Sequence, residues 1–330
     1  MSLQRLNSTK PLILDGGTST HLERAYHKNL TSTVLWSSSY LYQDPQAIRN
    51  VHLDYLRAGA DIISTCSYQA SVAGFKEFTQ AEAEELMKSS VSLATEARDI
   101  FWDEYQKDNK ENSQSFRDIP LVALSLGPYG AVLCNGAEYT GDYGAATFDD
   151  ILRFHKERLD IYAPMFSQVD FIAFETIPSL QEANIIQALL KHVPNCPPTW
   201  VSFSCRNSHL VSHGEPLTEC INACMDVSSV VAVGVNCTNP QHVGDLIGIT
   251  RRQLDDMGLV EKWVMCYPDS GAAWDDVRKE WIIATGISAD TFGTLSKEWV
   301  NIVDKKRIII GGCCNTTPNH IRNLRLQVFG

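Results

Sequence analysis

The chain has 330 residues, of which 44% are hydrophobic and 20% are charged, and its formal net charge is −11. This length suits either two domains or one large α/β barrel, and the composition is that of a globular enzyme with an ample core. The negative charge argues against nucleic acid or an anionic membrane surface as a partner, and no apolar run is long enough to span a membrane.

The N-terminal residues lack the apolar core of a signal peptide. The ten cysteines do not follow the spacing of a small disulfide-rich secreted domain, so we expect reduced thiols and a cytoplasmic protein.

Eight apolar runs are each bounded by glycine, proline or polar residues, which is typical of strands buried on both faces of a parallel sheet. They span residues 10–15, 60–68, 119–127, 169–176, 199–205, 230–237, 262–268 and 307–311.

Helix-start signals lie between these runs, as N-cap residues followed by proline or as capping boxes. They are Asp44-Pro45, Thr79–Glu82, Ser179–Glu182, Asn239-Pro240 and Thr317-Pro318, and a further helix is expected over residues 147–162.

Strands alternating with helices eight times predict a single-domain (β/α)8 TIM barrel over residues 1–330. An open doubly wound sheet is the alternative, but no G-x-G-x-x-G follows any strand. The polar stretch 107–117 is expected to be a surface loop.

In such a barrel the active site lies where the strands end. The side chains at the expected strand ends are Asp15, Thr65, Glu175, Cys237, Tyr267, Cys313 and Cys314.

The three thiols are the most unusual members of this set. Zn²⁺ prefers thiolate sulfur, and a catalytic zinc keeps one position open beside three protein ligands. The spacing matches no regular metal motif, so Cys313 and Cys314 could instead be small buried residues or a redox-active vicinal disulfide.

Asp15 and Glu175 could bind a cationic ammonium, form an acid/base pair or cap neighbouring backbone. An ammonium-binding role suits an amino-acid substrate. Gly16 and Gly17 would then let backbone N–H groups approach its carboxylate closely.

Several longer motifs occur in a fixed order along the chain. They are Asp15-Gly-Gly, Leu35-Trp-Ser37, Gly59-Ala-Asp-Ile-Ile, Gly136-x-Glu-Tyr, Phe174-Glu-Thr-Ile-Pro-Ser179, Gly234-Val-Asn-Cys237, Tyr267-Pro-x-Ser-Gly271 and Gly311-Gly-Cys-Cys. In these motifs the sequence resembles the homocysteine S-methyltransferase family, and most of all the branch that uses S-methylmethionine or S-adenosylmethionine as methyl donor.

The resemblance implies a (β/α)8 barrel that holds one Zn²⁺, with the homocysteine thiol as its fourth ligand. The implied zinc ligands are Cys237, Cys313 and Cys314; the implied substrate contacts are Asp15 and Glu175 for the ammonium, and Thr65, Gly16 and Gly17 for the carboxylate. Trp36 matches a position near the methyl donor, where an indole face would stabilise a sulfonium cation. It could equally be a buried anchor.

The expected reaction is transfer of a methyl group from the sulfonium donor to homocysteine, giving methionine. Residues 128–144 could close over the donor or form an ordinary surface loop. The sequence does not rank the two donors and does not reveal the oligomeric state. Two other functions remain possible, namely a betaine-dependent homocysteine methyltransferase and a zinc or thiol redox sensor built on a barrel.

Overall fold

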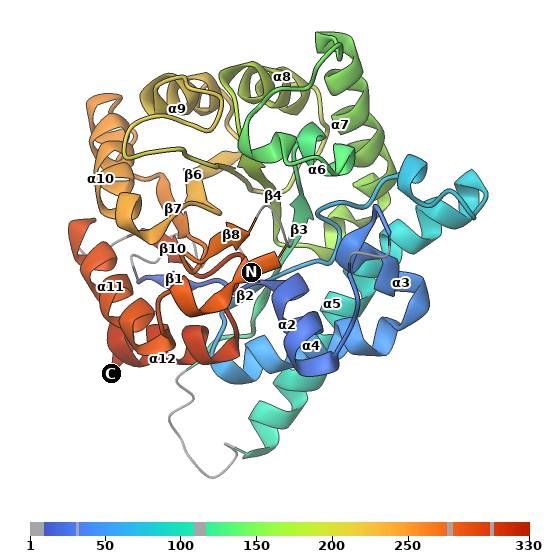
Figure 1. Cartoon of the computed structure of the whole chain (residues 1–330), viewed down its shortest axis with the longest axis horizontal. Helices are drawn as coiled ribbons and strands as arrows, with labels where there is room; N and C mark the ends of the chain where they lie inside the picture. Colours follow the sequence, from blue (N-terminus) through green and yellow to red (C-terminus); the bar gives the residue numbers. More distant parts are fainter. Residues whose placement is uncertain (1–9, 31–32, 109–116, 276–279, 304–306) are drawn as a thin grey trace.

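A computed structural model describes residues 10–30, 33–108, 117–275, 280–303 and 307–330. Eight parallel strands form one sheet that curls into a barrel, with helices around it (Figure 1). In spatial order they are β1 (Leu12–Ile13), β10 (Ile308–Ile310), β7 (Trp263–Tyr267), β6 (Val230–Asn236), β5 (Thr199–Phe203), β4 (Phe171–Ile177), β3 (Leu121–Leu126) and β2 (Ile62–Ser64). An isolated parallel bridge between Leu14 and Ile62 joins β1 to β2 and closes the circle. The predicted (β/α)8 barrel is confirmed.

The helices lie around the outside of the barrel (Figure 1). The α-helices are α2 (Thr18–Tyr26), α3 (Tyr40–Gln43), α4 (Pro45–Ala58), α5 (Gln80–Asp108), α6 (Tyr129–Leu133), α7 (Phe148–Tyr162), α8 (Leu180–Leu190), α9 (Leu217–Met225), α10 (Pro240–Asp256), α11 (Ala289–Ile302) and α12 (Pro318–Phe329). The short 3-10 helices are η1 (Trp36–Ser39), η2 (Val72–Gly74), η3 (Ala137–Tyr139), η4 (Ala163–Gln168) and η5 (Ile283–Thr285).

Two details differ from the expected elements. A two-stranded antiparallel hairpin, β8 (Ala273–Asp275) with β9 (Glu280–Ile282), follows β7 and was not predicted. The polar stretch 107–117 begins inside α5 rather than in a loop, and its residues 109–116 lie outside the described part of the chain.

Alternate side chains of each strand fill the barrel interior, because successive residues of a strand point to opposite faces. The interior cluster consists of Leu12, Leu14, Ile62, Leu121, Ala123, Phe171, Ala173, Trp200, Ala232, Trp263, Met265, Tyr267 and Ile309. The intervening residues, such as Ile13, Val122 and Ile172, join a larger core cluster with residues of the surrounding helices. Both faces of the sheet are therefore buried, which explains the continuous apolar runs in the sequence.

Local signals at the helix ends set several of these boundaries. The Asp44 side chain accepts a hydrogen bond from Ala47 N–H, and Gly59 ends the same helix, α4, with a left-handed φ of 117°. The box at Ser179 is only half formed. Ser179 Oγ accepts from Glu182 N–H at 3.2 Å, but the Glu182 carboxylate binds residues of other elements instead.

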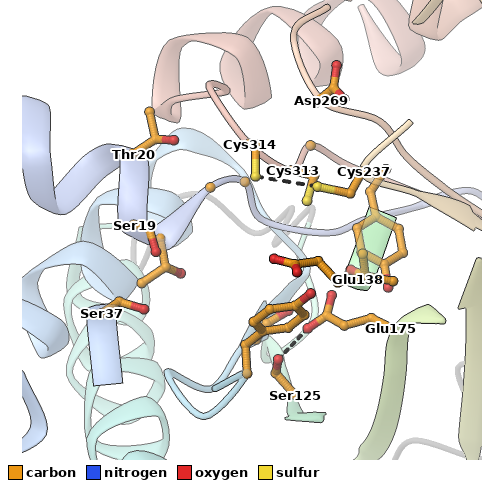
Figure 2. A pocket seen from close by; sticks show the side chains of 18 of the residues that line it. Ser19, Thr20, Ser37, Ser125, Glu138, Glu175, Cys237, Asp269, Cys313 and Cys314 are labelled. Atoms are coloured by element: carbon orange, nitrogen blue, oxygen red, sulfur yellow. Dashed lines mark hydrogen bonds between the residues drawn. The ribbon is translucent and has the colours of Figure 1, made fainter. Parts of the chain in front are cut away.

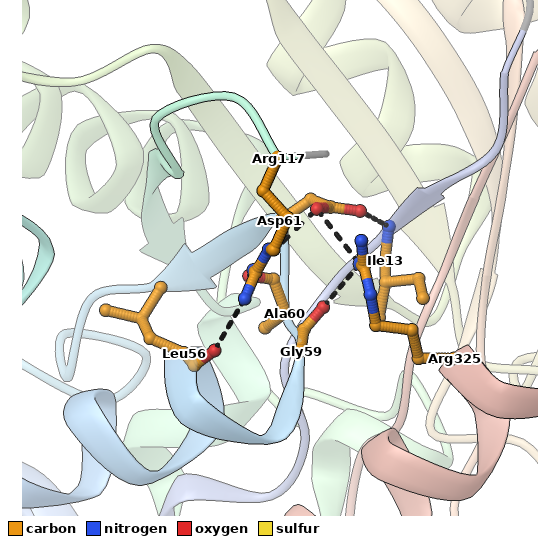
Figure 3. Close-up of polar contacts among 7 residues, drawn as sticks. All are labelled: Ile13, Leu56, Gly59, Ala60, Asp61, Arg117 and Arg325. Atoms are coloured by element: carbon orange, nitrogen blue, oxygen red, sulfur yellow. Dashed lines mark hydrogen bonds and ion pairs between the residues drawn. The ribbon is translucent and has the colours of Figure 1, made fainter. Parts of the chain in front are cut away.

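Asp61 links β1, β2 and α12 through its side-chain contacts, at the N-terminal end of the strands where β1 meets β2 (Figure 3). Its carboxylate accepts from Ile13 N–H at 3.1 Å and from Arg325 Nη1 of α12 at 3.1 Å. Arg117 Nη2 lies 3.8 Å from the same carboxylate, whose side chain is only 8% exposed. Two guanidinium groups from distant parts of the chain thus meet at the closing seam.

Asp61→Ala should lower the free energy of unfolding by about 2–3 kcal/mol, because it removes the anion that two guanidinium groups share and the acceptor of a backbone N–H. Urea unfolding measures this loss. Glu104→Ala is the matched control, because it breaks the half-exposed Arg57–Glu104 pair and should change stability by at most about 0.5 kcal/mol. An equal effect of both variants would contradict the role of Asp61.

Candidate active site

A cavity of about 860 Å³ opens at the C-terminal ends of the strands (Figure 2). This volume is in the usual range for small-molecule sites. Its wall contains every residue for which the sequence predicts a site role: Asp15, Gly16, Gly17, Trp36, Thr65, Glu175, Cys237, Cys313 and Cys314. The barrel has brought together residues that lie up to 299 positions apart, as where Gly17 N–H donates to Thr316 Oγ1 at 3.3 Å in this region.

The three thiols form one cluster at the ends of β6 and β10. Their Sγ atoms all lie within 4.8 Å of one another, and Cys237 Sγ is 3.4 Å from Cys314 Sγ. Sulfur atoms around a tetrahedral Zn²⁺ are roughly 3.8 Å apart, given a Zn–S bond near 2.3 Å. The donor set and its spacing therefore fit a thiolate-bound zinc.

Backbone hydrogen bonds between neighbouring strand ends hold the cluster in place. Cys237 N–H donates to the Tyr267 carbonyl at 3.1 Å, and Cys313 N–H donates to the Pro268 carbonyl at 2.8 Å. Cys237 adopts a left-handed φ of 47°, which turns the chain sharply after β6. The Cys314 carbonyl accepts from Ser270 N–H at 3.0 Å, so all three cysteines are held by the end of β7 and the segment after it, and the barrel preorganises the cluster.

The two predicted carboxylates are both buried in the cavity wall. Asp15 Oδ2 accepts from Ser64 N–H at 2.7 Å, and Ser125 Oγ donates to Glu175. Burial raises the pKa of Asp15 to about 8 and the pKa of Glu175 to about 7, and for Asp15 the nearby Glu175 charge adds to the effect. Two buried carboxyl groups with raised pKa values would be stabilised as anions by a bound cation.

Thr65 and the glycines support the wall as well as lining it. Thr65 Oγ1 accepts from Ser125 N–H at 3.0 Å and lies 2.6 Å from Ser67 Oγ, so it positions the serine that binds Glu175. A Cβ on Gly17 would lie 2.7 Å from the Cys313 carbonyl oxygen, so a side chain does not fit. Direct contact of Thr65 with substrate stays a prediction.

The N-terminus of α2 also faces the cavity. Its N-cap is Gly17, which offers no side-chain acceptor to the first turn, and Thr18, Ser19 and Thr20 line the cavity wall. Unpaired N–H groups at a helix N-terminus favour an anion. This turn therefore adds to the carboxylate-binding groups that the sequence assigned to the two glycines.

The 128–144 segment contributes Cys134, Asn135, Gly136, Glu138 and Tyr139 to the cavity wall, and none of them was assigned a role from the sequence. Tyr139 Oη lies 3.3 Å from Cys237 Sγ and 4.0 Å from Cys314 Sγ. Glu138 reaches into the cavity, and its Oε2 atom is buried with no hydrogen-bond partner among the described residues (Figure 2). Burial raises its pKa. Both Glu138 and Tyr139 belong to the Gly136-x-Glu-Tyr motif, and this motif is the sequence feature that could have identified them as site residues.

The ionisable side chains that line the cavity are acidic rather than basic. Five carboxyl side chains line it, and none of its described lining residues is Lys, Arg or His. The acidic members are Asp15, Glu23, Glu138, Glu175 and Asp269. A ligand that carries positive charge is favoured here, and its own carboxylate must be bound by backbone N–H groups and hydroxyls.

Comparison with known proteins agrees with this geometry. The family model described as homocysteine S-methyltransferase matches residues 12–328. The chain belongs to the homocysteine S-methyltransferase family. It is 40% identical to homocysteine S-methyltransferase 2 of Arabidopsis thaliana over 320 residues, which cover 96% of this chain and 92% of the relative. It is also 40% identical to a selenocysteine Se-methyltransferase of Brassica oleracea var. italica, over 96% of this chain and 88% of the relative.

Among solved structures, the metallated form of the homocysteine methyltransferase MmuM from Escherichia coli is similar. The TM-score is 0.79 with 32% identity, over 99% of this chain and 100% of the other. The identities and coverage confirm that this homocysteine S-methyltransferase family member is an enzyme of the transferase class. Within the described part of the chain, no helix has the length and apolar character needed to cross a membrane.

Trp36 lies between the cavity and the core. It lines the cavity and also packs, half-buried, against the main core cluster, with a left-handed φ of 46°. Its indole is therefore held by packing while remaining available to the cavity. Contact with a methyl donor stays a prediction for this family member.

Proposed function

We propose that this protein transfers a methyl group from a sulfonium donor, S-methylmethionine or S-adenosylmethionine, to the sulfur of homocysteine, producing methionine. The observation that carries the proposal is the placement of a three-thiol cluster beside buried carboxylates in one acidic cavity. In the reaction a carbon–sulfur bond forms to homocysteine while the donor's methyl–sulfur bond breaks. Its electron pair stays on the donor sulfur, which leaves as a neutral thioether.

Cys237, Cys313 and Cys314 would hold the zinc. When bound, zinc lowers the pKa of a coordinated substrate thiol and so supplies a thiolate at neutral pH. No side chain is then needed as a base, and the remaining residues have only to bind and orient two substrates.

The protein's own groups fit the zwitterionic ends of homocysteine. Asp15 and Glu175 would share its ammonium, and Glu138 offers a third carboxylate whose Oε2 is unpartnered in the described structure. The first turn of α2 and the Gly16 backbone would bind its carboxylate. Tyr139, close to Cys237 Sγ, would exclude water from the reacting sulfur.

Two alternatives are less well supported. Betaine is the first, and its carboxylate does not separate it from the sulfonium donors, which carry one too; what favours a sulfonium donor is that the motifs most resemble the branch of the family that uses one. A redox sensor would use the thiols but has no need for Asp15 and Glu175 in the same cavity.

The test is methionine formation from homocysteine with each donor, using wild-type protein with zinc. S-methylmethionine or S-adenosylmethionine should support turnover and betaine should not. Turnover only with betaine would establish the alternative donor. Absence of turnover with every donor, in protein that holds zinc, would overturn the proposal.

We also propose that residues 1–330 form one domain that acts on small molecules in the cytoplasm. One barrel accounts for all eight parallel strands, and all ten cysteines are free thiols, which suits a reducing compartment.

A further inference from the structure

Glu182 is a completely buried carboxylate outside the cavity. It lies in the first turn of α8, where it was expected to close a capping box. Three donor groups from other elements converge on it instead. Tyr129 N–H donates to Oε1 at 2.7 Å, Tyr143 Oη donates to Oε2, and His155 Nε2 of α7 lies 2.7 Å from Oε1.

Two of these partners mark the ends of the 128–144 segment. Tyr129 begins α6 and Tyr143 follows η3, and their rings meet edge to face with centroids 5.4 Å apart. Burial and the Glu182 carboxylate raise the pKa of Tyr143 well above its ordinary value, so the phenol keeps the proton that it donates. One carboxylate therefore binds the segment at both ends.

The middle of the same segment enters the cavity. Glu138 and Tyr139 lie between the two bound ends and line the wall beside the thiol cluster. The segment is also folded tightly on itself, since a Cβ on Gly130 would lie 2.5 Å from Glu138 N and 2.8 Å from Tyr143 Cε1. A shift of either end would therefore displace Glu138.

We propose that Glu182 is a positioning residue that clasps both ends of the 128–144 segment and so fixes Glu138 and Tyr139 in the cavity. Hydrogen bonds to an ionised carboxylate are stronger than those between neutral groups, particularly where water is excluded. The clasp itself does not depend on which substrates bind. Its kinetic consequence rests on the proposed function.

The first test measures amide hydrogen exchange of the zinc-loaded protein without substrate. In Glu182→Gln and in Tyr143→Phe, amides of residues 130–141 should exchange about tenfold or more faster, because a hydrogen bond to a charged group is lost. Ser179→Ala is the matched control: it removes the N-cap of α8 but leaves the clasp, so the segment should exchange as in wild type. Unchanged exchange of the segment in both clasp variants would overturn the proposal.

The second test is kinetic and separates positioning from general destabilisation. Glu182→Gln should lower kcat/KM for homocysteine about tenfold or more, because a misplaced group near the reacting atoms is costly. In a Tyr139→Phe, Glu138→Gln background the same change should have little further effect, since the residues through which it acts are already gone. If Glu182→Gln lowered kcat/KM by the same factor in this background as in wild type, the proposal would be contradicted. If Glu182→Gln does not fold, Tyr143→Phe takes its place in both tests.

Wild-type inactivity towards homocysteine would refute the proposed function alone and leave the exchange test of the clasp valid.

Discussion

Cys313→Ser should lose bound zinc and reduce methionine formation to background. A serine hydroxyl is not ionised at neutral pH and does not replace a thiolate ligand. Outer-shell changes typically cost 10–100-fold in metal affinity, so loss of a direct ligand should weaken zinc binding by more than about 100-fold. The measurements are zinc per chain after dialysis and the rate of methionine formation, both in freshly reduced protein.

Cys196→Ser is the matched control for this variant. Cys196 is also a free, partly buried thiol, but it lies outside the cavity and contacts Thr199 Oγ1, a contact that serine can keep. It should retain zinc and activity. If Cys313→Ser held zinc as tightly as wild type, the assignment of the cluster as the metal site would be wrong.

Asp15→Asn should lower kcat/KM for homocysteine by about 100-fold, because it removes one of two buried charges proposed to bind the ammonium. The same change should stabilise the protein in the absence of substrate. Asparagine can keep the hydrogen bond from Ser64 N–H while removing a carboxylate whose burial is unfavourable. Loss of activity together with a gain in stability is the signature of a functional carboxylate.

The stability that Asp15→Asn gains should depend on pH, because the pKa of Asp15 is raised to about 8 in the folded protein. The unfolded carboxyl ionises near pH 4, so between about pH 4 and 8 the folded state holds a proton that the unfolded state has released. Wild-type stability therefore falls across this window, and the advantage of Asp15→Asn should grow to at least about 1 kcal/mol at pH 8. Thermal unfolding of wild type and Asp15→Asn at pH 5 and pH 8 measures this advantage. A stability difference that is the same at both pH values would contradict the raised pKa of Asp15.

Much of the fold was predictable because its signals are local. The buried strands appear as apolar runs, and α4 is delimited by Asp44 with Pro45 and by Gly59 at the two ends. The hairpin of β8 and β9 was missed because its short strands carry no comparable apolar run. The site residues at the strand ends were predictable from one rule, which is that residues following parallel strands meet at the same end of a barrel.

Other site features depended on pairings that no local pattern specifies. Ser179 and Glu182 have the spacing of a capping box, yet Glu182 turns to Tyr129 and Tyr143, more than 35 positions away. The motif that contains Glu138 and Tyr139 was visible, but the direction of its side chains depends on how the segment folds over the barrel.

The sequence by itself therefore determined the barrel, several helix starts, the three thiols and the carboxylates at the strand ends. These follow from periodicity, capping and topology, which act over a few residues or through the order of strands. Only the tertiary structure decided how Asp61 closes the seam, how Glu182 binds the segment above the cavity and which groups surround the thiols. Those outcomes depend on contacts between residues far apart in the chain, and a buried polar group binds whichever partners the packing brings within reach.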